Sequence, residues 1–370
     1  MTLTQLWRKP EFKILIVGCL IMFFSFINLL FIEEVDFVKS HSFKQLFWII
    51  IATFLIFVIT RIRLKTLKDI SVPIYVLSLI LLILVLFIGE KISGSRSWLK
   101  FGDLLSFQPS ELAKIAFIFI IAKFYSELGA YSKSYIIKYF LGFVFFIFPF
   151  LLIVIQPDLG SAFMLLAISL SMIFSFSYNK KILISIVLIF LIFSVPIWNN
   201  GLREYQKERI INFINPDKDP SGYGYNAIQS KIAVGSGKIL GKGLGKSSQG
   251  KFRFLPEKHT DFAFSVWAEQ TGLLGSTVIL FLFSFLVIYP LSFLDKIKDQ
   301  FLQVLLFGMC SYFFFHFIIN ISMTIGLFPV IGIPILMFSY GGSSMVCAAT
   351  ALSVISLIIA EYRDVNELGI

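Results

Sequence analysis

The chain has 370 residues, of which 57% are hydrophobic and 15% are charged, and it carries a net charge of +10. Such a composition, with 44 phenylalanines, excludes an ordinary soluble domain and predicts a protein that crosses a membrane several times. The lysines and arginines gather in short clusters between apolar runs, which favours membrane topology and lipid headgroups over nucleic acid as the explanation of the positive charge.

Ten apolar runs are interpreted as membrane helices, which need about 20 residues each. In chain order the predicted spans are Phe12–Ile32, Phe43–Thr60, Val72–Ile88, Leu112–Tyr125, Ile136–Ile155, Leu159–Tyr178, Ile182–Trp198, Leu273–Leu291, Phe301–Leu327 and Ser343–Ala360. An even number of spans puts both termini on one side. That side has thirteen basic residues against five in the short loops opposite, which predicts cytoplasmic N- and C-termini. The expected fold is an all-α polytopic membrane protein, with residues 1–370 in a single membrane domain.

The stretch SWLKFGDLLSFQPSELAK, residues 97–114, leads into the fourth predicted span, and its proline and serine are helix-start signals. Glu111 and Lys114 are three residues apart, so they share a helix face and can form an ion pair. Ionisable groups at the outer end of a span usually face protein rather than lipid, and mark a functional or structural pair. A single tryptophan such as Trp98 is typical of an interfacial anchor.

Residues 200–262 contain no span and are predicted to form one large extracytoplasmic loop between spans seven and eight, where function is concentrated. The glycine-lysine stretch GSGKILGKGLGKSS, residues 235–248, is not a nucleotide phosphate loop, because Leu240 stands where that motif requires glycine. Two interpretations stay open. Backbone amides with Lys238, Lys242 and Lys246 could bind a polyanion such as pyrophosphate, or the stretch could be a flexible, solvated loop.

The stretch FLPEKHTDFAFSVWAEQTG, residues 254–272, places Glu257, His259 and Asp261 directly before the eighth span. In a helix, Asp261 and Glu269 would lie on one polar side, because they are two four-residue steps apart. An unbroken helix from Asp261 to the end of the span would be about 46 Å long, so its first part should enter the interface or line a cavity. A carboxylate there is a candidate general base, and a solvated helix N-terminus is the alternative.

The stretch FPVIGIPILMFSYGGSS, residues 328–344, interrupts an apolar run with prolines and glycines. Irregular backbone at membrane depth is tolerated only against protein or a water-filled cavity, so this stretch, which includes Ser343, is expected to line the cavity. His316 and Asn320 in the ninth span are interpreted as hydrogen-bonded core groups. His41, in an outer loop, is expected to be solvated.

Taken together, these stretches resemble the SEDS family of shape, elongation, division and sporulation proteins, and within it the RodA branch. The similarity rests on SWLKFG, FQPSELAK, QPDLGSA, NPDKDPSGYGYNAIQSKIAVGSGKILGKG, FLPEKHTDFAF and IGLFPVIGIPILMFSYGGSS, in that order. It implies a peptidoglycan glycosyltransferase that polymerises lipid II for cell elongation and rod shape. The reaction would take place on the extracytoplasmic face of the bacterial cytoplasmic (inner) membrane. The implied partners are a class B penicillin-binding protein, which is a transpeptidase, and the elongation machinery.

The resemblance also assigns roles to residues. It places the family's essential aspartate on Asp261, which is therefore the expected catalytic residue. It places the family's motif residues on Trp98, Glu111 and Lys114, which are expected to bind substrate. Apart from the resemblance, the further expected substrate-binding residues are Lys242, Lys246, Glu257, His259 and Ser343. Many family members have arginine directly before the tryptophan, whereas this chain has Ser97 there and Arg96 one step earlier. No arginine role is transferred for this reason.

Inverting glycosyl transfer needs a base for the attacking sugar hydroxyl, whereas a pyrophosphate can leave once positive charge stabilises it. Asp261 is predicted to be that base or, alternatively, to hold a divalent cation, Mg or Mn, as the one possible cofactor. Lys242 and Lys246, or the cation, would neutralise the pyrophosphate. Two other functions fit the sequence: a flippase that transports lipid II, and a non-catalytic scaffold for the penicillin-binding protein. The extracytoplasmic position of Asp261 and the lack of an obvious inverted repeat favour the enzyme.

Overall fold

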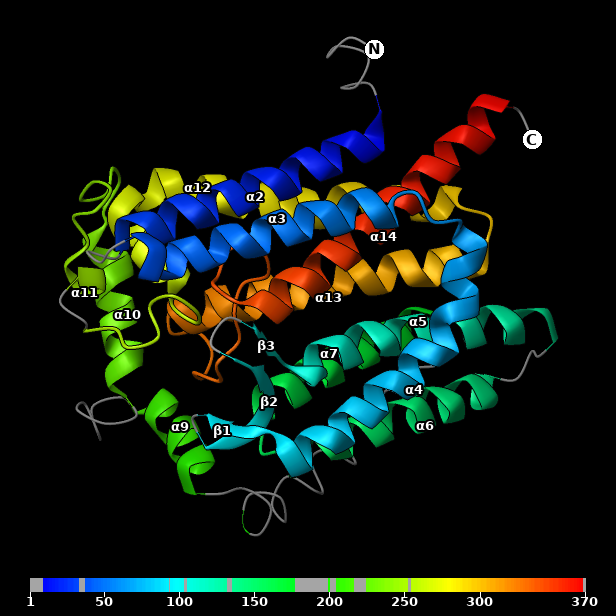
Figure 1. Cartoon of the computed structure of the whole chain (residues 1–370), viewed down its shortest axis with the longest axis horizontal. Helices are drawn as coiled ribbons and strands as arrows, with labels where there is room; N and C mark the ends of the chain where they lie inside the picture. Colours follow the sequence, from blue (N-terminus) through cyan, green and yellow to red (C-terminus); the bar gives the residue numbers. More distant parts are fainter. Residues whose placement is uncertain are drawn as a thin grey trace.

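The computed structural model describes residues 9–32, 37–92, 94–102, 105–131, 135–176, 199, 204–215, 224–251 and 254–368. Within these ranges, long helices form a bundle whose axis is horizontal in Figure 1. The long helices are α2 Pro10–Ile32, α3 His41–Ile59, α4 Leu64–Ile88, α5 Pro109–Tyr131, α6 Tyr135–Ile155, α7 Leu159–Phe176, α12 Ala263–Leu291, α13 Gln300–Thr324 and α14 Gly342–Leu368. The shorter elements are η1 Phe37–Lys39, β1 Glu90–Ile92, β2 Ser95–Phe101, β3 Leu105–Phe107, α9 Glu204–Ile214, α10 Tyr225–Ser236, α11 Ser248–Lys251 and η4 Leu294–Lys296.

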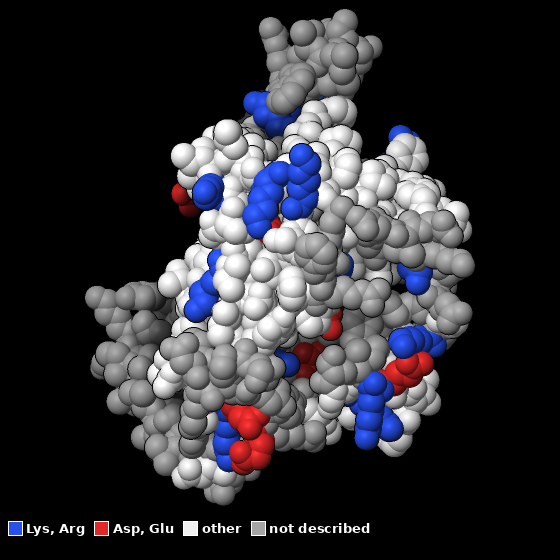
Figure 2. All heavy atoms as spheres, turned by 90° about the vertical axis from the view of Figure 1, so that its left-hand side faces the viewer, with Lys and Arg blue, Asp and Glu red and all other residues white. Residues whose placement is uncertain are grey.

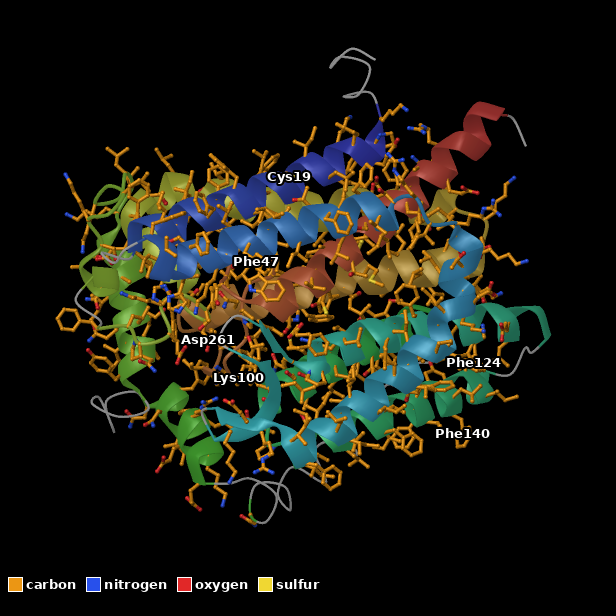
Figure 3. The ribbon with its side chains drawn as sticks, in the orientation of Figure 1. Cys19, Phe47, Lys100, Phe124, Phe140 and Asp261 are labelled. Atoms are coloured by element: carbon orange, nitrogen blue, oxygen red, sulfur yellow. The ribbon has the colours of Figure 1, made fainter. Side chains whose placement is uncertain are left out.

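The prediction of a polytopic, mainly helical membrane protein is confirmed. In the described residues, seven helices are long and apolar enough to cross a membrane: α2, α3, α4, α6, α12 with η4, α13 and α14. Helices α5 and α7 coincide with two more predicted spans, and Ile182–Trp198 lies outside the described residues. Large apolar side chains are exposed on the outer surface of the bundle, as a lipid-facing surface requires, and Phe47 and Phe140 are two of them (Figure 3).

Helix α5 lies at the centre of the bundle because it is apolar on every side. Its side chains from Ala113 to Ala122 are all buried, and Lys114 is buried with them. The helix packs against α4, α6, α7, α13 and α14. The helices α4, α5, α6 and α7 form the lower half of the bundle in Figure 1, and α2, α3, α12 and α14 lie above them. The contact between α5 and α13 links these two groups.

The two ends of the bundle differ. The start of α2 and the end of α14 lie at one end, where Arg363 forms an ion pair with Glu11. The short helices α9, α10 and α11 lie at the opposite end (Figure 1). The described ends of the chain therefore share a side, as predicted. The segment between spans seven and eight is at the other end of the molecule, and in its described part it contains helices rather than loop alone.

A small antiparallel sheet connects α4 to α5 and was not predicted. Strand β2 lies between β1 and β3, with Trp98 opposite Glu90 and Leu99 opposite Phe107. Ser97 and Leu99 are buried, whereas Trp98 is half-buried. This alternation with a period of two is what a strand with one buried face requires.

Helix α12 begins at Ala263 and is broken at Gly272, so the unbroken helix from Asp261 whose length the sequence analysis considered does not form. Gly272 has φ 67° and ψ −161°, a conformation that L side chains rarely adopt. A Cβ atom at this position would lie 2.3 Å from the backbone nitrogen of Gly241. The break lets the glycine-lysine stretch bond to the helix, with the Leu273 amide donating to the Lys238 carbonyl at 2.8 Å. Glycine is therefore required at Gly272 and Gly241, because the two backbone segments approach each other too closely for a side chain.

Candidate active site

Asp261 lies in the turn directly before α12, and two other segments fix its position. The side-chain amide of Asn320 on α13 donates to the Asp261 carbonyl at 2.8 Å and to the Ile333 carbonyl at 2.6 Å. Gly332 lies against the carboxylate itself, because a Cβ atom there would be 3.2 Å from Asp261 Oδ2. The irregular stretch after α13 therefore packs against Asp261, as the prediction that it lines the site requires.

The surroundings of Asp261 raise the pKa of its carboxyl to about 7. The main cause is burial, which disfavours the charged form, and the carboxylate of Glu257 adds repulsion. The positive charge of Arg209 and a hydrogen bond from the Thr260 side chain act in the opposite direction. A half-buried carboxyl with a pKa near neutrality is suited to accept a proton during a reaction.

A pocket lies between α9, α10 and the turn after α13, and its lining residue Val330 packs against the apolar cluster that contains Phe262, the residue after Asp261. It is lined by polar and charged side chains, Arg209, Asn212 and Lys231, and by apolar ones that include Phe328 and Val330. Arg209 connects this pocket with Asp261, since its charge acts on the Asp261 carboxyl. The same end of the molecule is hollowed near its middle, with acidic side-chain atoms inside the hollow and basic atoms at its edge (Figure 2).

Glu111 and Lys114 form the predicted ion pair, at 2.7 Å, and both side chains are buried. Helix α13 completes the cluster: Tyr312 Oη donates to Glu111 Oε2 at 2.8 Å, and His316 Nε2 lies 3.0 Å from Lys114 Nζ. The other ring nitrogen of His316 lies 3.2 Å from the Pro334 carbonyl oxygen. The pair thus lies in the core and is connected, through α13, to the stretch that contacts Asp261.

His316 and Asn320 are therefore hydrogen-bonded core groups, as predicted. With Tyr312 they form a row at intervals of four residues along one face of α13. This row connects the buried pair to the Asp261 turn, and its spacing is visible in the sequence.

Glu269 is fully buried and binds the glycine-lysine stretch. It accepts hydrogen bonds from Lys242 Nζ at 2.5 Å, from Ser248 Oγ at 2.8 Å and from the Ser247 hydroxyl. Lys242 therefore has an acidic partner that the sequence analysis did not predict, whereas Lys246 is exposed on the loop. Asp261 and Glu269 do not form one polar side, because Glu269 is held by the loop.

The turn that carries Asp261 also contains Glu257 and His259, so the structure brings three predicted site residues together. Glu257 is exposed and accepts from the Thr260 hydroxyl at 3.1 Å. The ring of His259 stacks on His41, with centroids 4.4 Å apart. The expectation that His41 is a solvated loop residue is wrong, because it is half-buried and is the first residue of α3.

Trp98, Lys246 and Ser343 are not among the residues that line the described pocket. Ser343 is buried between α14 and β3, where it accepts from the Gln108 amide at 2.9 Å and donates to the Ser106 carbonyl at 3.1 Å. The hydroxyl of Ser343 therefore forms hydrogen bonds within the protein, to the segment that leads into α5. The substrate-binding roles of the predicted residues stay predictions.

Arg209, Asn212 and Lys231 were missed by sequence analysis. Nothing in their spacing connects them with Asp261, which lies 30 or more residues further along the chain. Lys231 is at this end of the bundle because α10 packs against both α12 and α13, and Arg209 and Asn212 line the same pocket from α9.

The described part of the protein offers few side chains that could bind a divalent cation near Asp261. Among the described residues, no group of three or more His, Cys, Asp or Glu side chains could hold a metal ion. A cation at Asp261 would need substrate oxygens and water as its other ligands, which is a coordination that Mg²⁺ commonly adopts.

Comparison with known proteins supports one family. The model of the family FTSW_RODA_SPOVE, cell cycle protein, matches residues 10–364. The peptidoglycan glycosyltransferase MrdB of Escherichia coli K12 is 33% identical over 294 residues, covering 79% of this chain and 78% of that protein. The peptidoglycan glycosyltransferase RodA of Treponema pallidum is 28% identical, covering 93% of this chain and 94% of that protein. A probable peptidoglycan glycosyltransferase FtsW of Buchnera aphidicola is 34% identical, with coverages of 87% and 85%.

Two solved structures have the same fold. A chain from a peptidoglycan synthase complex, in which polymerization is coordinated with crosslinking, matches with a TM-score of 0.79 and 26% identity, covering 95% of this chain and 97% of that one. The rod shape determining protein RodA of Thermus thermophilus matches with a TM-score of 0.69 and 24% identity, covering 95% and 96%.

Proposed function

The chain belongs to the SEDS family of cell cycle proteins, and we propose that it polymerises lipid II with Asp261 as the general base. Relatives named MrdB, RodA and FtsW are peptidoglycan glycosyltransferases, and this chain is accordingly a glycosyltransferase. The family predicted from the sequence is confirmed. A role in elongation and rod shape agrees with the relatives named MrdB and RodA.

The reaction joins two lipid-linked sugars. A hydroxyl oxygen of the acceptor forms a bond to the anomeric carbon of the donor, while the bond from that carbon to the diphosphate oxygen breaks with inversion. Asp261 takes the proton from the hydroxyl, and the diphosphate leaves with the electron pair. The observation that carries this assignment is a half-buried carboxyl whose pKa of about 7 is near the pH at which it would work.

The alternative role for Asp261 is to hold a divalent cation against the diphosphate. Coordination at Asp261 would be completed by the substrate, because the described residues offer no cluster of metal ligands. In that arrangement the cation would supply positive charge to the leaving diphosphate. Chelation with EDTA would then abolish activity, whereas a general base acting alone would still work in EDTA.

We propose the extracytoplasmic face of the cytoplasmic membrane as the place of reaction. The site lies at the end of the bundle opposite the described chain termini, whose side the basic residues predict to be cytoplasmic (Figure 3). A class B penicillin-binding protein and the elongation machinery are the proposed partners, because a related chain is part of a peptidoglycan synthase complex. A flippase or a scaffold is less well supported, since the relatives are named as enzymes.

Purified Asp261→Asn protein tests the proposal in a lipid II polymerisation assay without a partner. The variant removes the base with little change in shape, so strand synthesis should fall by about 10²-fold or more. Asp295→Asn is the matched control, because Asp295 is an exposed acid in η4 beyond the C-terminal end of α12. Strand synthesis at the wild-type rate by the Asp261 variant would contradict the proposal.

A further inference from the structure

We propose that Arg209 and Lys231 bind the diphosphate of the lipid-linked sugar in the pocket beside Asp261. This inference rests on the proposed function, because it assigns the leaving group of that reaction to a place in the protein. It assigns the diphosphate to residues other than those of the glycine-lysine stretch, for which the sequence left anion binding and a flexible loop both open.

The pocket provides two cations from two different helices. Arg209 is on α9 and Lys231 is on α10, and both line the same pocket with the buried amide side chain of Asn212. Among the described lining residues there is no carboxylate. An arginine binds two phosphate oxygens through its planar group, and a lysine adds a compact positive charge. This set of groups fits a diphosphate better than it fits a neutral sugar.

The turn after α13 directs Lys231. Gly326 has φ +79°, and a Cβ atom on it would lie 2.7 Å from Lys231 Cδ. The absence of that atom lets the aliphatic part of the lysine lie across the turn, toward the rim of the pocket. Phe328 and Val330, which follow Gly326 in the same turn, form an apolar wall of the pocket.

The position of the cations suits the chemistry at Asp261. The pocket is close to Asp261, because its lining residue Val330 is two residues before Gly332, which lies against the Asp261 carboxyl. In an inverting displacement the base and the leaving group act on opposite sides of one sugar carbon, so the groups that serve them should lie within about 10 Å of each other. When the bond from carbon to oxygen breaks, the diphosphate gains negative charge, which Arg209 and Lys231 would stabilise.

The loop lysines are less suited to this task. Lys242 is bound to the buried carboxylate of Glu269 at 2.5 Å, so its charge is already compensated. Lys246 is exposed on the loop and does not line the pocket.

The test measures binding rather than turnover. Inorganic pyrophosphate is titrated against the purified full-length protein, with Asp261→Asn as the background so that no substrate is consumed. Arg209→Gln and Lys231→Gln should each weaken pyrophosphate binding by about tenfold or more, because each removes a charged hydrogen-bond donor. Lys231→Arg should retain most of the affinity. Lys298→Gln is the matched control, because Lys298 is an exposed lysine between η4 and α13 that does not line the pocket, and it should bind as the background protein does.

Wild-type affinity in both glutamine variants would overturn the proposal, as would a background protein that binds no pyrophosphate. Thermal unfolding of each variant shows whether it is folded, and Arg209→Lys serves as the second arginine variant. In the active protein, the same two glutamine substitutions should also slow lipid II polymerisation. The proposed function fails separately, if Asp261→Asn polymerises lipid II at the wild-type rate, whatever the binding result.

Discussion

Asp261 and Glu269 are two carboxylates only eight residues apart, yet their surroundings differ. Glu269 is fully buried and is surrounded by donors from the glycine-lysine stretch, among them Lys242 at 2.5 Å. Asp261 is half-buried, and its nearest charged neighbours include another acid, Glu257. A buried carboxylate with all its partners stabilises structure, whereas one that is short of compensating charge can exchange a proton. The comparison separates a structural acid, Glu269, from the acid proposed to be catalytic, Asp261.

Removing the Glu269 carboxylate should have the largest effect on stability. Glu269→Ala leaves Lys242 without its partner and leaves buried donors unpaired, so we expect a loss of about 3–5 kcal/mol. Thermal unfolding in detergent would measure it. Glu269→Gln keeps the shape and should lose less, and a Glu269→Ala protein as stable as wild type would remove the distinction between the two acids.

The same reasoning applies to the buried pair on α5. Lys114→Met leaves Glu111 charged and without its cation, so it should destabilise the protein by about 3–5 kcal/mol. The double variant Glu111→Gln with Lys114→Met should be more stable than Lys114→Met alone, because no buried charge is left unpaired. A double-mutant cycle of unfolding temperatures checks this prediction, and additive losses would contradict it.

The break in α12 should depend on glycine. Gly272→Ala puts a side chain at a positive φ and 2.3 Å from another backbone atom, so we expect a loss of about 1–3 kcal/mol or more. Gly235→Ala is the matched control, since a Cβ atom there meets nothing within 4 Å. Equal unfolding temperatures for the two variants would show that the close approach of the loop to α12 contributes little.

Asp261→Asn is the one of these substitutions that should cost no stability: below about pH 4 it should leave stability unchanged, and at higher pH it should raise it. The pKa of Asp261 is about 7 in the folded protein and near 3.9 when unfolded, so between these values the folded state binds more protons. Stability contributed by this group therefore falls as pH rises through that window. At pH 8 the asparagine variant avoids the penalty, and an unfolding temperature well below wild type would indicate a structural role for Asp261.

The sequence predicts the parts of this molecule that depend on local patterns. The helices follow from apolar runs, and the Glu111–Lys114 pair follows from its three-residue spacing. The strand at Ser97 and Leu99 could have been found from its alternation, although neighbouring apolar runs dominated the interpretation. The helix break at Gly272 could not be found, because its cause is the backbone of Gly241, about thirty residues earlier.

The site was predicted only in part for the same reason. Asp261 and its neighbours are contiguous in sequence, and the family resemblance identified them. The sequence pattern assigns Lys242 to the substrate, because it does not reveal that the distant residue Glu269 is the acidic partner of this lysine. Arg209 and Lys231 reach the site through helix packing, which no local pattern reports.

The pH dependence of lipid II polymerisation tests the role of Asp261 most directly. If the ionised Asp261 is the base, the rate should rise with pH and reach half its maximum near pH 7. Glu257→Gln removes the repelling charge, so the pKa of Asp261 should fall and the midpoint should move to lower pH. A wild-type rate that does not change between pH 5 and 8, or a midpoint that Glu257→Gln leaves in place, would contradict the assignment.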